Sequence, residues 1–333
     1  MPLLLTRRDV ESVLTMEETI AAVEVGLRQL AAGRAIMPQR TAIRMNEHHG
    51  LHLGMPAYIA GATADDPGTL ALKAVTVYPD NPSRHQLPTI FGTILLHDAR
   101  TGQLLAIMDA GFLTAMRTGA ASGVATKYLA REDARSAGVF GAGAQARTQL
   151  MAVAVVRRLE RAVVCDLVPA VSERFATDMS ARLGIPVTVT ASAGDCLACD
   201  IVIAATSSAT PIFEGTKLRP GTHLNAVGSH SPNARELDTE AIRRSTVVAD
   251  HKPACLAEAG DLLLPIQEGA INEDHIVASV GEIAAGAKPG RTSRDEITLF
   301  KSVGLAVEDV AAAGRVYALA RAAGVGKEIE IQV

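Results

Sequence analysis

The spacing of hydrophobic residues changes along the first third of the chain from a helical to a strand-like pattern. Apolar side chains recur every three or four residues between Met16 and Ala32, which predicts a helix. Thr15 and Glu18 form a capping-box signature at its start. The Thr-Gly turn signal at 101–102 predicts a hairpin. We therefore expect an α+β domain with a mainly antiparallel sheet. Its strand-like runs are 41–45, 70–78, 89–97 and 104–109.

From about residue 112 the pattern becomes an alternation of helices and strands. Small residues crowd a predicted helix over 112–130, which indicates close contact with another element or a ligand. Alternation with right-handed crossovers builds a parallel sheet whose carboxyl edge faces a ligand. A last helix is predicted over 305–323, and no strand pattern follows it in the sequence. This helix is expected to return to the first domain. Further helices are predicted over 145–159 and 169–183, and strands at 137–140, 162–166, 187–190, 200–206, 222–227 and 246–250.

These patterns together predict an α/β protein with two domains. A Rossmann domain with a doubly wound parallel sheet is expected over 118–304, and a smaller α+β domain over 1–117 and 305–333. A length of 333 residues, of which 48% are hydrophobic, is enough for two substantial cores.

Composition excludes several classes of function. The formal net charge is −4, aromatic residues make up 3% of the chain and Trp is absent, so a nucleic-acid partner is not expected. Apolar runs fall short of the roughly 20 residues of a membrane helix, and the first residues do not read as an export signal, so we expect a cytoplasmic protein. Cys196 and Cys199 form a C-x-x-C without a second pair or a nearby His. The four cysteines are therefore expected to be free thiols, and no metal site is expected.

The strongest local signal for chemistry is a glycine-rich turn after a predicted strand. Gly141, Gly143 and Ala146 make a G-x-G-x-x-A motif that opens the next helix. The first glycine permits the tight turn, the second lets the backbone approach a pyrophosphate, and the alanine allows close packing of the helix on the strand. Asp166 ends the next strand 25 residues after Gly141, where an acid binds the ribose of a dinucleotide. Because a carboxylate repels a 2′-phosphate and residues 167–169 include no Arg, NAD is expected in preference to NADP.

The chain as a whole resembles the ornithine cyclodeaminase/mu-crystallin family, which includes alanine dehydrogenases and ketimine reductases. The resemblance implies a homodimer, in which the domain of 1–117 and 305–333 binds the substrate and makes the subunit contact. It rests on motifs in the family's order: Met37-Pro38-Gln39-Arg40, Met55-Pro56-Ala57-Tyr58, Leu72-Lys73-Ala74, Leu87-Pro88-Thr89, residues 113–121, residues 141–145, Asn225-Ala226-Val227-Gly228 and residues 298–304.

The resemblance also implies which residues hold the two ligands. Arg40, Lys73 and Arg117 correspond to the family's clamp for the substrate carboxylate, and Val303 also lies at the substrate. Guanidinium groups suit this role because they bind a carboxylate bidentately. Lys73 stands out in the sequence itself, because it interrupts the apolar run 70–77, where an unpaired ammonium would be costly. Around the dinucleotide, beside Gly141 and Gly143 of the glycine turn, the family places Thr89, Arg117, Thr118, Ala144, Gln145, Asp166, Thr206, Asn225, Ala226, Val227, Gly228, Ser302 and Val303.

The sequence departs from ornithine cyclodeaminases at the amine end of the substrate. His230 stands where those enzymes carry an aspartate, and Ala234 replaces a following lysine. A second carboxylate expected before Met55 is missing, since Leu53 and Gly54 occupy that stretch. A pocket without these acids would bind the ornithine ammonium poorly. A neutral substrate is favoured: a cyclic imine with a carboxylate, such as pyrroline- or piperideine-carboxylate, or a 2-oxo acid with ammonia.

We therefore predict an NAD-dependent oxidoreductase that reduces a small imino acid or interconverts an amino acid and its 2-oxo acid. Hydride would come from NADH, and His230 or Lys73 would supply the proton to nitrogen. From the residues alone, a lone His in a loop such as His230 is more typical of a surface or hydrogen-bonding residue than of a proton donor. Thr206 and Asn225 read equally as strand-end hydrogen bonders. Two alternatives stay open: an ornithine cyclodeaminase, an NAD-dependent ammonia lyase that forms proline, and a non-catalytic mu-crystallin-like ligand-binding protein.

Overall fold

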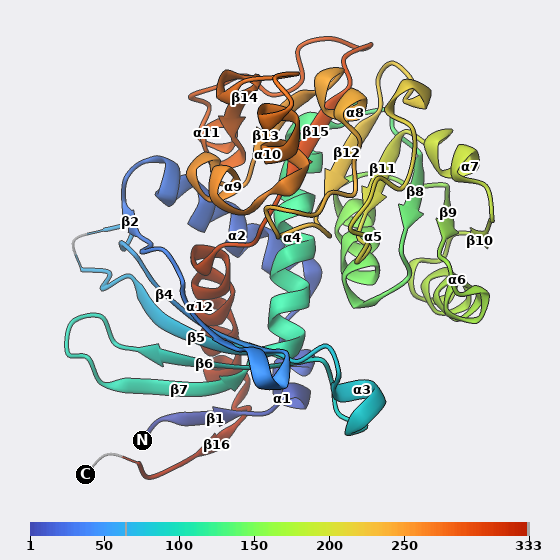
Figure 1. Ribbon diagram of the computed structural model, residues 1–333. Coiled ribbons are helices and arrows are strands. Elements are labelled where there is room, and N and C mark those ends of the chain that lie inside the picture. The colour runs from blue at the N-terminus through green and yellow to red at the C-terminus, as the bar shows by residue number, and fades with distance from the viewer. Residues whose placement is uncertain (64, 332–333) are drawn as a thin grey trace. The chain divides into compact units, whose positions relative to one another are not determined.

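The computed structural model describes residues 1–63 and 65–331, which form two compact units, each with its own sheet (Figure 1). Unit 1 comprises Met1–Arg117 and Leu305–Val333, and unit 2 comprises Thr118–Gly304. The boundary falls within helix α4 (Gly111–Leu129). One sheet is all parallel and the other is mixed, so the predicted combination of a Rossmann-type sheet with an α+β domain is confirmed.

Unit 1 is built on a sheet with the strand order β16-β1-β7-β6-β5-β4-β2, and β3 also pairs with β4. β1 pairs parallel with β7, and the other pairs are antiparallel, including the predicted β6–β7 hairpin. The strands are β1 (Leu3–Leu5), β2 (Ala35–Ile36), β3 (Thr41–Met45), β4 (Gly50–Ile59), β5 (Thr69–Val77), β6 (Ile90–His97), β7 (Leu104–Asp109) and β16 (Lys327–Glu328). The helices are α1 (Arg7–Val13), α2 (Met16–Ala31), α3 (Asn81–Arg84), α12 (Ala306–Ala323) and the 3-10 turn η1 (Asn46–His48).

Helix α12 covers the sheet of unit 1, packing on β4, β5 and β6 and on helix α2 (Figure 1). Its face toward these elements is apolar, with Val307, Val310 and Val316 fully buried. The same helix also carries two buried acids, Glu308 and Asp309, in its first turn. Burial of a charged group requires a partner, so α12 brings a buried electrostatic site into this core as well as apolar packing.

Several details of unit 1 differ from the sequence prediction, among them the short elements β1, α1, β2 and α3, which the pattern does not signal. β4 is not signalled by the pattern, because its two glycines and Pro56 are poor strand formers; pairing with β3 and β5 on its two sides overrides this propensity. The expectation that no strand follows the last helix is wrong, since β16 pairs with β1. Only half of the expected capping box forms: the Thr15 side chain accepts from Glu18 N, while the Glu18 carboxylate lies 2.6 Å from Arg315 Nε.

Unit 2 is built on an all-parallel sheet with the strand order β10-β9-β8-β11-β12-β15-β13-β14. The strands are β8 (Ser136–Phe140), β9 (Arg161–Cys165), β10 (Val187–Val189), β11 (Ile201–Ala204), β12 (His223–Ala226), β13 (Thr246–Ala249), β14 (Ile276–Ser279) and β15 (Thr298–Lys301). The helices are α5 (Ala144–Val156), α6 (Pro169–Leu183), α7 (Ala193–Leu197), α8 (Thr239–Arg243), α9 (Lys252–Glu258), α10 (Gly260–Gln267) and α11 (Val280–Ala284), with 3-10 turns η2 (Gly215–Lys217) and η3 (Glu273–His275).

Strand β15 lies between β12 and β13, although it is the last strand of this unit in the sequence. Neither β14 nor β15 is predicted by the pattern, because each is only four residues long. Helix α5 ends at Val156, earlier than predicted, because Arg157 adopts an extended backbone. The Arg157 guanidinium donates to the carbonyls of Thr126 and Ala130, both at 2.9 Å, and so satisfies the end of α4.

Cysteines and membrane-spanning features add little to the functional picture. All four cysteines are free thiols, as predicted, and burial raises the pKa of Cys196 to about 12. Over residues 1–63 and 65–331, no group of three His, Cys, Asp or Glu side chains is placed to hold a metal ion. Within the same residues, no helix combines the length and apolarity needed to cross a bilayer. A cytoplasmic location remains a prediction.

Candidate active site

The glycine turn after β8 has the conformation that the motif requires. Gly141 has a φ of +89°, and a Cβ placed on it would lie 2.5 Å from the carbonyl oxygen of Ala205. A side chain is therefore excluded both by backbone conformation and by contact with the loop after β11. The Gly141 N–H donates to the Cys165 carbonyl at 2.9 Å, which ties the turn to the end of β9.

Gly143 occupies a different environment from Gly141. It is the N-cap of α5, so no side chain caps the first N–H groups of this helix. A Cβ placed on Gly143 would meet no atom within 4 Å. The protein itself thus leaves open the space that its missing side chain would fill. The Gln145 side-chain oxygen in the same turn is buried and has no hydrogen-bond partner among the described residues. An open helix N-terminus with unpaired polar groups fits the pyrophosphate of a dinucleotide.

Asp166 follows β9 and is fastened to this turn. Its Oδ2 accepts a hydrogen bond of 2.8 Å from the Ala142 N–H, and its Oδ1 accepts one of 3.0 Å from Val168 N–H. Each carboxylate oxygen has two lone pairs, so these contacts leave acceptor capacity for a ligand hydroxyl. The structure therefore brings Gly141, Gly143 and Asp166 together at one edge of the parallel sheet.

A buried acid that the sequence reasoning missed organises the neighbouring strand ends. Glu236 accepts from the N–H and hydroxyl of Thr206 at 2.7 and 2.6 Å, and from Gly228 N–H and Ser229 N–H at 2.7 and 3.1 Å. It thereby cross-links the loops that follow β11 and β12. Burial raises the pKa of Glu236, and Lys301 and the Thr206 hydrogen bonds oppose this shift. In sequence, Glu236 is one more acid in a polar loop and carries no distinguishing signal.

Lys301 and Asp261 continue this buried network. Lys301 Nζ lies 2.6 Å from Asp261 Oδ2 and donates to the Ser229 carbonyl at 2.7 Å. Asp261 Oδ1 accepts from the N–H groups of Glu236 and Leu237 at 2.7 and 3.0 Å. The loop after β12 contains His230 and was predicted to contact the dinucleotide. Charged groups buried in unit 2 therefore hold this loop in place.

Three of the other predicted cofactor residues, Asn225, Ser302 and Thr118, have hydrogen-bond partners within unit 2. Asn225 is fully buried and donates to the Thr126 hydroxyl at 2.9 Å. Ser302 donates to Asp250 Oδ2 at 2.9 Å, and the Val303 N–H donates to the same oxygen at 2.7 Å. The Thr118 carbonyl accepts from Gln149 at 3.0 Å. Their contacts with a dinucleotide, like those of Ala144, Ala226, Val227 and the partly exposed Thr89, stay predictions.

His230 lies in the loop after β12 and is exposed. One of its ring nitrogens, Nδ1, is 3.0 Å from the Gly228 carbonyl oxygen. This contact orients the ring through the backbone of the same loop that Glu236 holds. The proposed proton-donor role of His230 remains a prediction.

Unit 1 contains a buried cluster of charges around Lys73 of β5. Lys73 is 2% exposed, and its Nζ lies 2.6 Å from Asp309 Oδ2 of α12. Its cross-strand neighbours are Met55 on β4 and Ile94 on β6, which point to the same face and are equally buried. The apolar setting that the sequence indicated for Lys73 is therefore observed, and α12 supplies the counter-charge.

Arg117 of α4 joins the same cluster. Its Nε lies 2.8 Å from Asp309 Oδ1 and its Nη1 lies 2.7 Å from Glu308 Oε2. The structure thus brings together two of the three predicted carboxylate-binding cations and adds two acids that were missed. In sequence Glu308 and Asp309 read as ordinary first-turn acids of a helix, which favour the positive end of its dipole. Arg40 immediately precedes β3 and is partly buried, and its place in the clamp stays a prediction.

Burial disfavours the charged form of both cations, but their pKa values are shifted in opposite directions because their neighbouring charges differ. Burial lowers the pKa of Lys73 to about 8, Asp309 opposes this shift, and the positive charge of Arg117 adds to it. Burial also opposes the charged form of Arg117, but Asp309 and Glu308 outweigh it and raise the Arg117 pKa. Arg117 is therefore a fixed cation, whereas Lys73 can exchange a proton near neutral pH.

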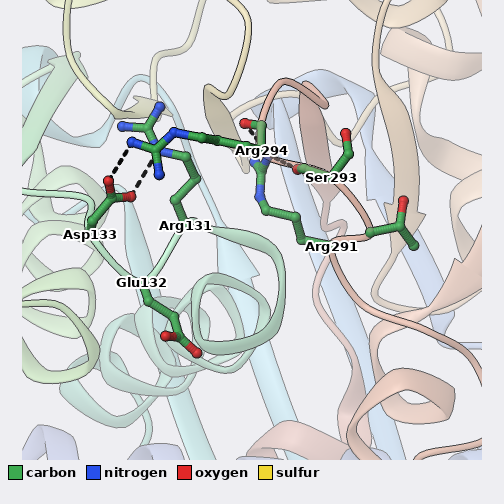
Figure 2. Close-up of a pocket in the computed structure, with 7 residues that line it drawn as sticks. Arg131, Glu132, Asp133, Arg291, Ser293 and Arg294 are labelled. Carbon is green, nitrogen blue, oxygen red and sulfur yellow. Dashed lines mark hydrogen bonds and ion pairs between the residues drawn. The ribbon is translucent and has the colours of Figure 1, made fainter.

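A separate surface depression in unit 2, with a volume of about 410 Å³, is lined by polar residues of two loops (Figure 2). Arg131 and Arg294 both pair with Asp133 there, at 3.1 and 2.6 Å. Figure 2 shows these side chains directed at one another. Arg131 and Arg294 already have an acidic partner, and Arg291 donates to backbone carbonyls such as that of Leu129. The predicted site residues lie elsewhere in the sequence and the fold.

A Rossmann-type unit with an open glycine turn and a ribose-type acid, in a chain that also buries a lysine and an arginine with acids, defines a dinucleotide-dependent oxidoreductase. The family model for the ornithine cyclodeaminase/mu-crystallin family matches residues 1–324. The chain therefore belongs to this family.

Three relatives share nearly the full length of the chain. A Delta(1)-pyrroline-2-carboxylate reductase of Bacillus cereus is 39% identical over 330 residues, covering 98% of this chain and 99% of the relative. The structure of the Thermococcus litoralis Delta(1)-pyrroline-2-carboxylate reductase with NADH and L-proline is 47% identical, with a TM-score of 0.93 over 98% of this chain and 100% of that one. An archaeal alanine dehydrogenase dimer with bound NAD is 35% identical, with a TM-score of 0.92 over 99% of each chain.

Proposed function

We propose that this protein uses NADH to reduce a small cyclic imino acid, with Delta(1)-pyrroline-2-carboxylate as the preferred candidate and L-proline as its product. The observation that carries the proposal is the pair of buried cations, Lys73 and Arg117, held in one cluster of unit 1. Buried cations of this kind suit the carboxylate of such a substrate. Relatives with this activity or these ligands support the choice of substrate.

The residues of the chain divide the work of this reaction. Lys73 and Arg117 bind the carboxylate and so fix the orientation of the C=N bond. When bound, NADH supplies the hydride that the imine carbon accepts. Lys73 holds a proton at Nζ and, with a pKa of about 8, can release it to the substrate nitrogen near neutral pH. The nitrogen gains that proton as the C=N bond becomes a single bond, and Lys73 is reprotonated from solvent. His230 is the second candidate for this donor.

Interconversion of an amino acid and its 2-oxo acid is the second candidate function, because the archaeal alanine dehydrogenase is 35% identical over almost the whole chain. The same carboxylate-binding cations would serve pyruvate as well as a cyclic imine. Ornithine cyclisation is a weaker candidate, since His230 and Ala234 replace the acid and the lysine of that reaction.

Purified protein with NADH and one substrate at a time separates these candidates. We expect NADH consumption with pyrroline-2-carboxylate, in equal molar amounts with L-proline formed, and a much lower kcat/KM with pyruvate and ammonia. Preference for pyruvate would favour the dehydrogenase. Conversion of ornithine to proline without net consumption of cofactor would favour the cyclodeaminase. Binding of NADH without turnover of any imino acid at several pH values would favour a ligand-binding protein.

The expected preference for NAD over NADP depends on Asp166. Asp166→Ser retains one acceptor for the Ala142 N–H and removes the negative charge, so the ratio of NADPH to NADH affinity should rise by about tenfold or more. Asp178→Ser is the matched control, because Asp178 is an acid of the adjacent helix α6 that pairs with Arg147. Fluorescence titration with both nucleotides measures the ratio. If the ratio is the same in wild type and Asp166→Ser, Asp166 does not set the preference.

We also propose a homodimer formed through unit 1. Several large apolar residues on this unit are exposed, including Ile36 (65%), Ile43 (61%), Leu87 (48%), Ile90 (49%) and Phe91 (46%). Exposed apolar side chains of this kind would be buried favourably in a protein interface, and a second copy is the expected occupant because the archaeal alanine dehydrogenase relative is a dimer. Size-exclusion chromatography with light scattering should give a mass twice that of the 34.8 kDa chain. A monomer mass at micromolar concentration would contradict the proposal.

A further inference from the structure

The two acids at the start of α12 have unequal positions in the charge cluster. Glu308 pairs with Arg117 and also accepts from the Leu305 N–H at 3.4 Å, as part of the helix cap. Asp309 uses one oxygen for each cation: Oδ2 lies 2.6 Å from Lys73 Nζ, and Oδ1 lies 2.8 Å from Arg117 Nε. Asp309 therefore connects β5 to α4 through a single carboxylate.

We propose that Asp309 is a positioning residue for the reaction, which fixes Lys73 and Arg117 relative to one another so that both can address one substrate carboxylate. This inference rests on the proposed imino-acid reduction. It assigns Asp309 no contact with substrate or cofactor.

Geometry supports a positioning role. The two oxygens of a carboxylate are a fixed distance apart, so the ammonium and the guanidinium that bind them have little freedom to move independently. Lys73 has three N–H donors and Arg117 has five. The three ion pairs with α12 use only part of this capacity, so the pairing is compatible with binding a further anion.

Electrostatics around Lys73 also depends on Asp309. The charged groups that act on Lys73 are Asp309 and Glu308 of α12 and Arg117 of α4, while its cross-strand neighbours Met55 and Ile94 are uncharged. Asp309 opposes the effect of burial and raises the pKa of Lys73. Without the Asp309 charge, Lys73 would lose its proton at lower pH, because burial and Arg117 both favour the neutral amine.

The test compares Asp309→Asn and Asp309→Glu with wild type. Asp309→Asn keeps the shape but removes the charge, so the fall of kcat/KM on the basic side should move to lower pH by about one to three units. Asp309→Glu keeps the charge but lengthens the arm, so the basic limb should stay near its wild-type pH while kcat/KM for pyrroline-2-carboxylate falls by about 100-fold. Calorimetry with L-proline on the NADH-loaded protein should show weaker binding in both variants.

Two controls keep folding apart from function. Glu18→Gln removes another ion pair of α12, with Arg315, away from the cluster, and should leave the pH profile and L-proline affinity unchanged. NADH titration and thermal unfolding report whether each variant is folded. Should Asp309→Asn fail to fold, Asp309→Glu decides the question. Wild-type pH profile, kcat/KM and L-proline affinity in a folded Asp309 variant would overturn the inference, whereas an inactive wild type would instead overturn the proposed function.

Discussion

Replacing Lys73 by methionine should lower kcat for imino-acid reduction by about 1000-fold, because the proton donor and one carboxylate contact are lost together. Methionine suits the site, since Lys73 lies among Met55 and Ile94 on an apolar face, and Asp309 keeps Arg117 as a partner. NADH affinity should change little, because the glycine turn belongs to unit 2. Steady-state kinetics and NADH titration measure the two effects.

The matched control is Lys217→Met. Lys217 is an exposed lysine of the 3-10 turn η2 in unit 2, and it pairs with Glu214 at the start of that turn. This control should have wild-type kinetics. In wild type, kcat/KM should fall as the pH rises through about 8, because the protonated form of Lys73 is the active one and burial lowers its pKa to that value. A Lys73→Met variant with more than about a tenth of wild-type kcat would remove Lys73 from the mechanism and leave His230 as the donor.

The second large effect is expected at the glycine turn, where two neighbouring glycines should respond in opposite ways. Gly143→Asp should leave unfolding of the ligand-free protein unchanged, since a Cβ there meets nothing and Asp is a good N-cap. It should weaken NADH binding by about 1000-fold, because a carboxylate would face the pyrophosphate. Gly141→Ala should instead destabilise the fold by at least about 2 kcal/mol, through its positive φ and the contact with Ala205.

Thermal unfolding without ligand and fluorescence titration with NADH separate the two variants. The comparison serves as its own control, because both changes lie within one turn. Unchanged NADH affinity in a folded Gly143→Asp variant would show that the dinucleotide does not bind at this turn.

Local features of the fold and the site could be predicted from the sequence, and features made by distant partners could not. The turn at Gly141 and the acid at Asp166 are visible because their chemistry is fixed by short-range spacing. The burial of Lys73 is visible because it interrupts an apolar strand. The role of Glu236 is invisible, since its partners at Thr206 and Gly228 come together only when strands β11 and β12 pair.

The acids of α12 show the same limit more sharply. Asp309 lies 236 residues from Lys73 in the sequence, and nothing in the first turn of the helix distinguishes it from a dipole-stabilising acid. Strand β15 is similar, because four residues carry little pattern and its interior place in the sheet depends on pairing with β12 and β13. Tertiary pairing decided each of these features.

The central claim is that buried cations of unit 1 recognise a substrate carboxylate, and one binding comparison tests it most directly. Calorimetry on the NADH-loaded wild-type protein should detect binding of L-proline and at least about 100-fold weaker binding of L-prolinamide, which has the same ring but no carboxylate. Equal affinity for the two compounds would contradict the claim.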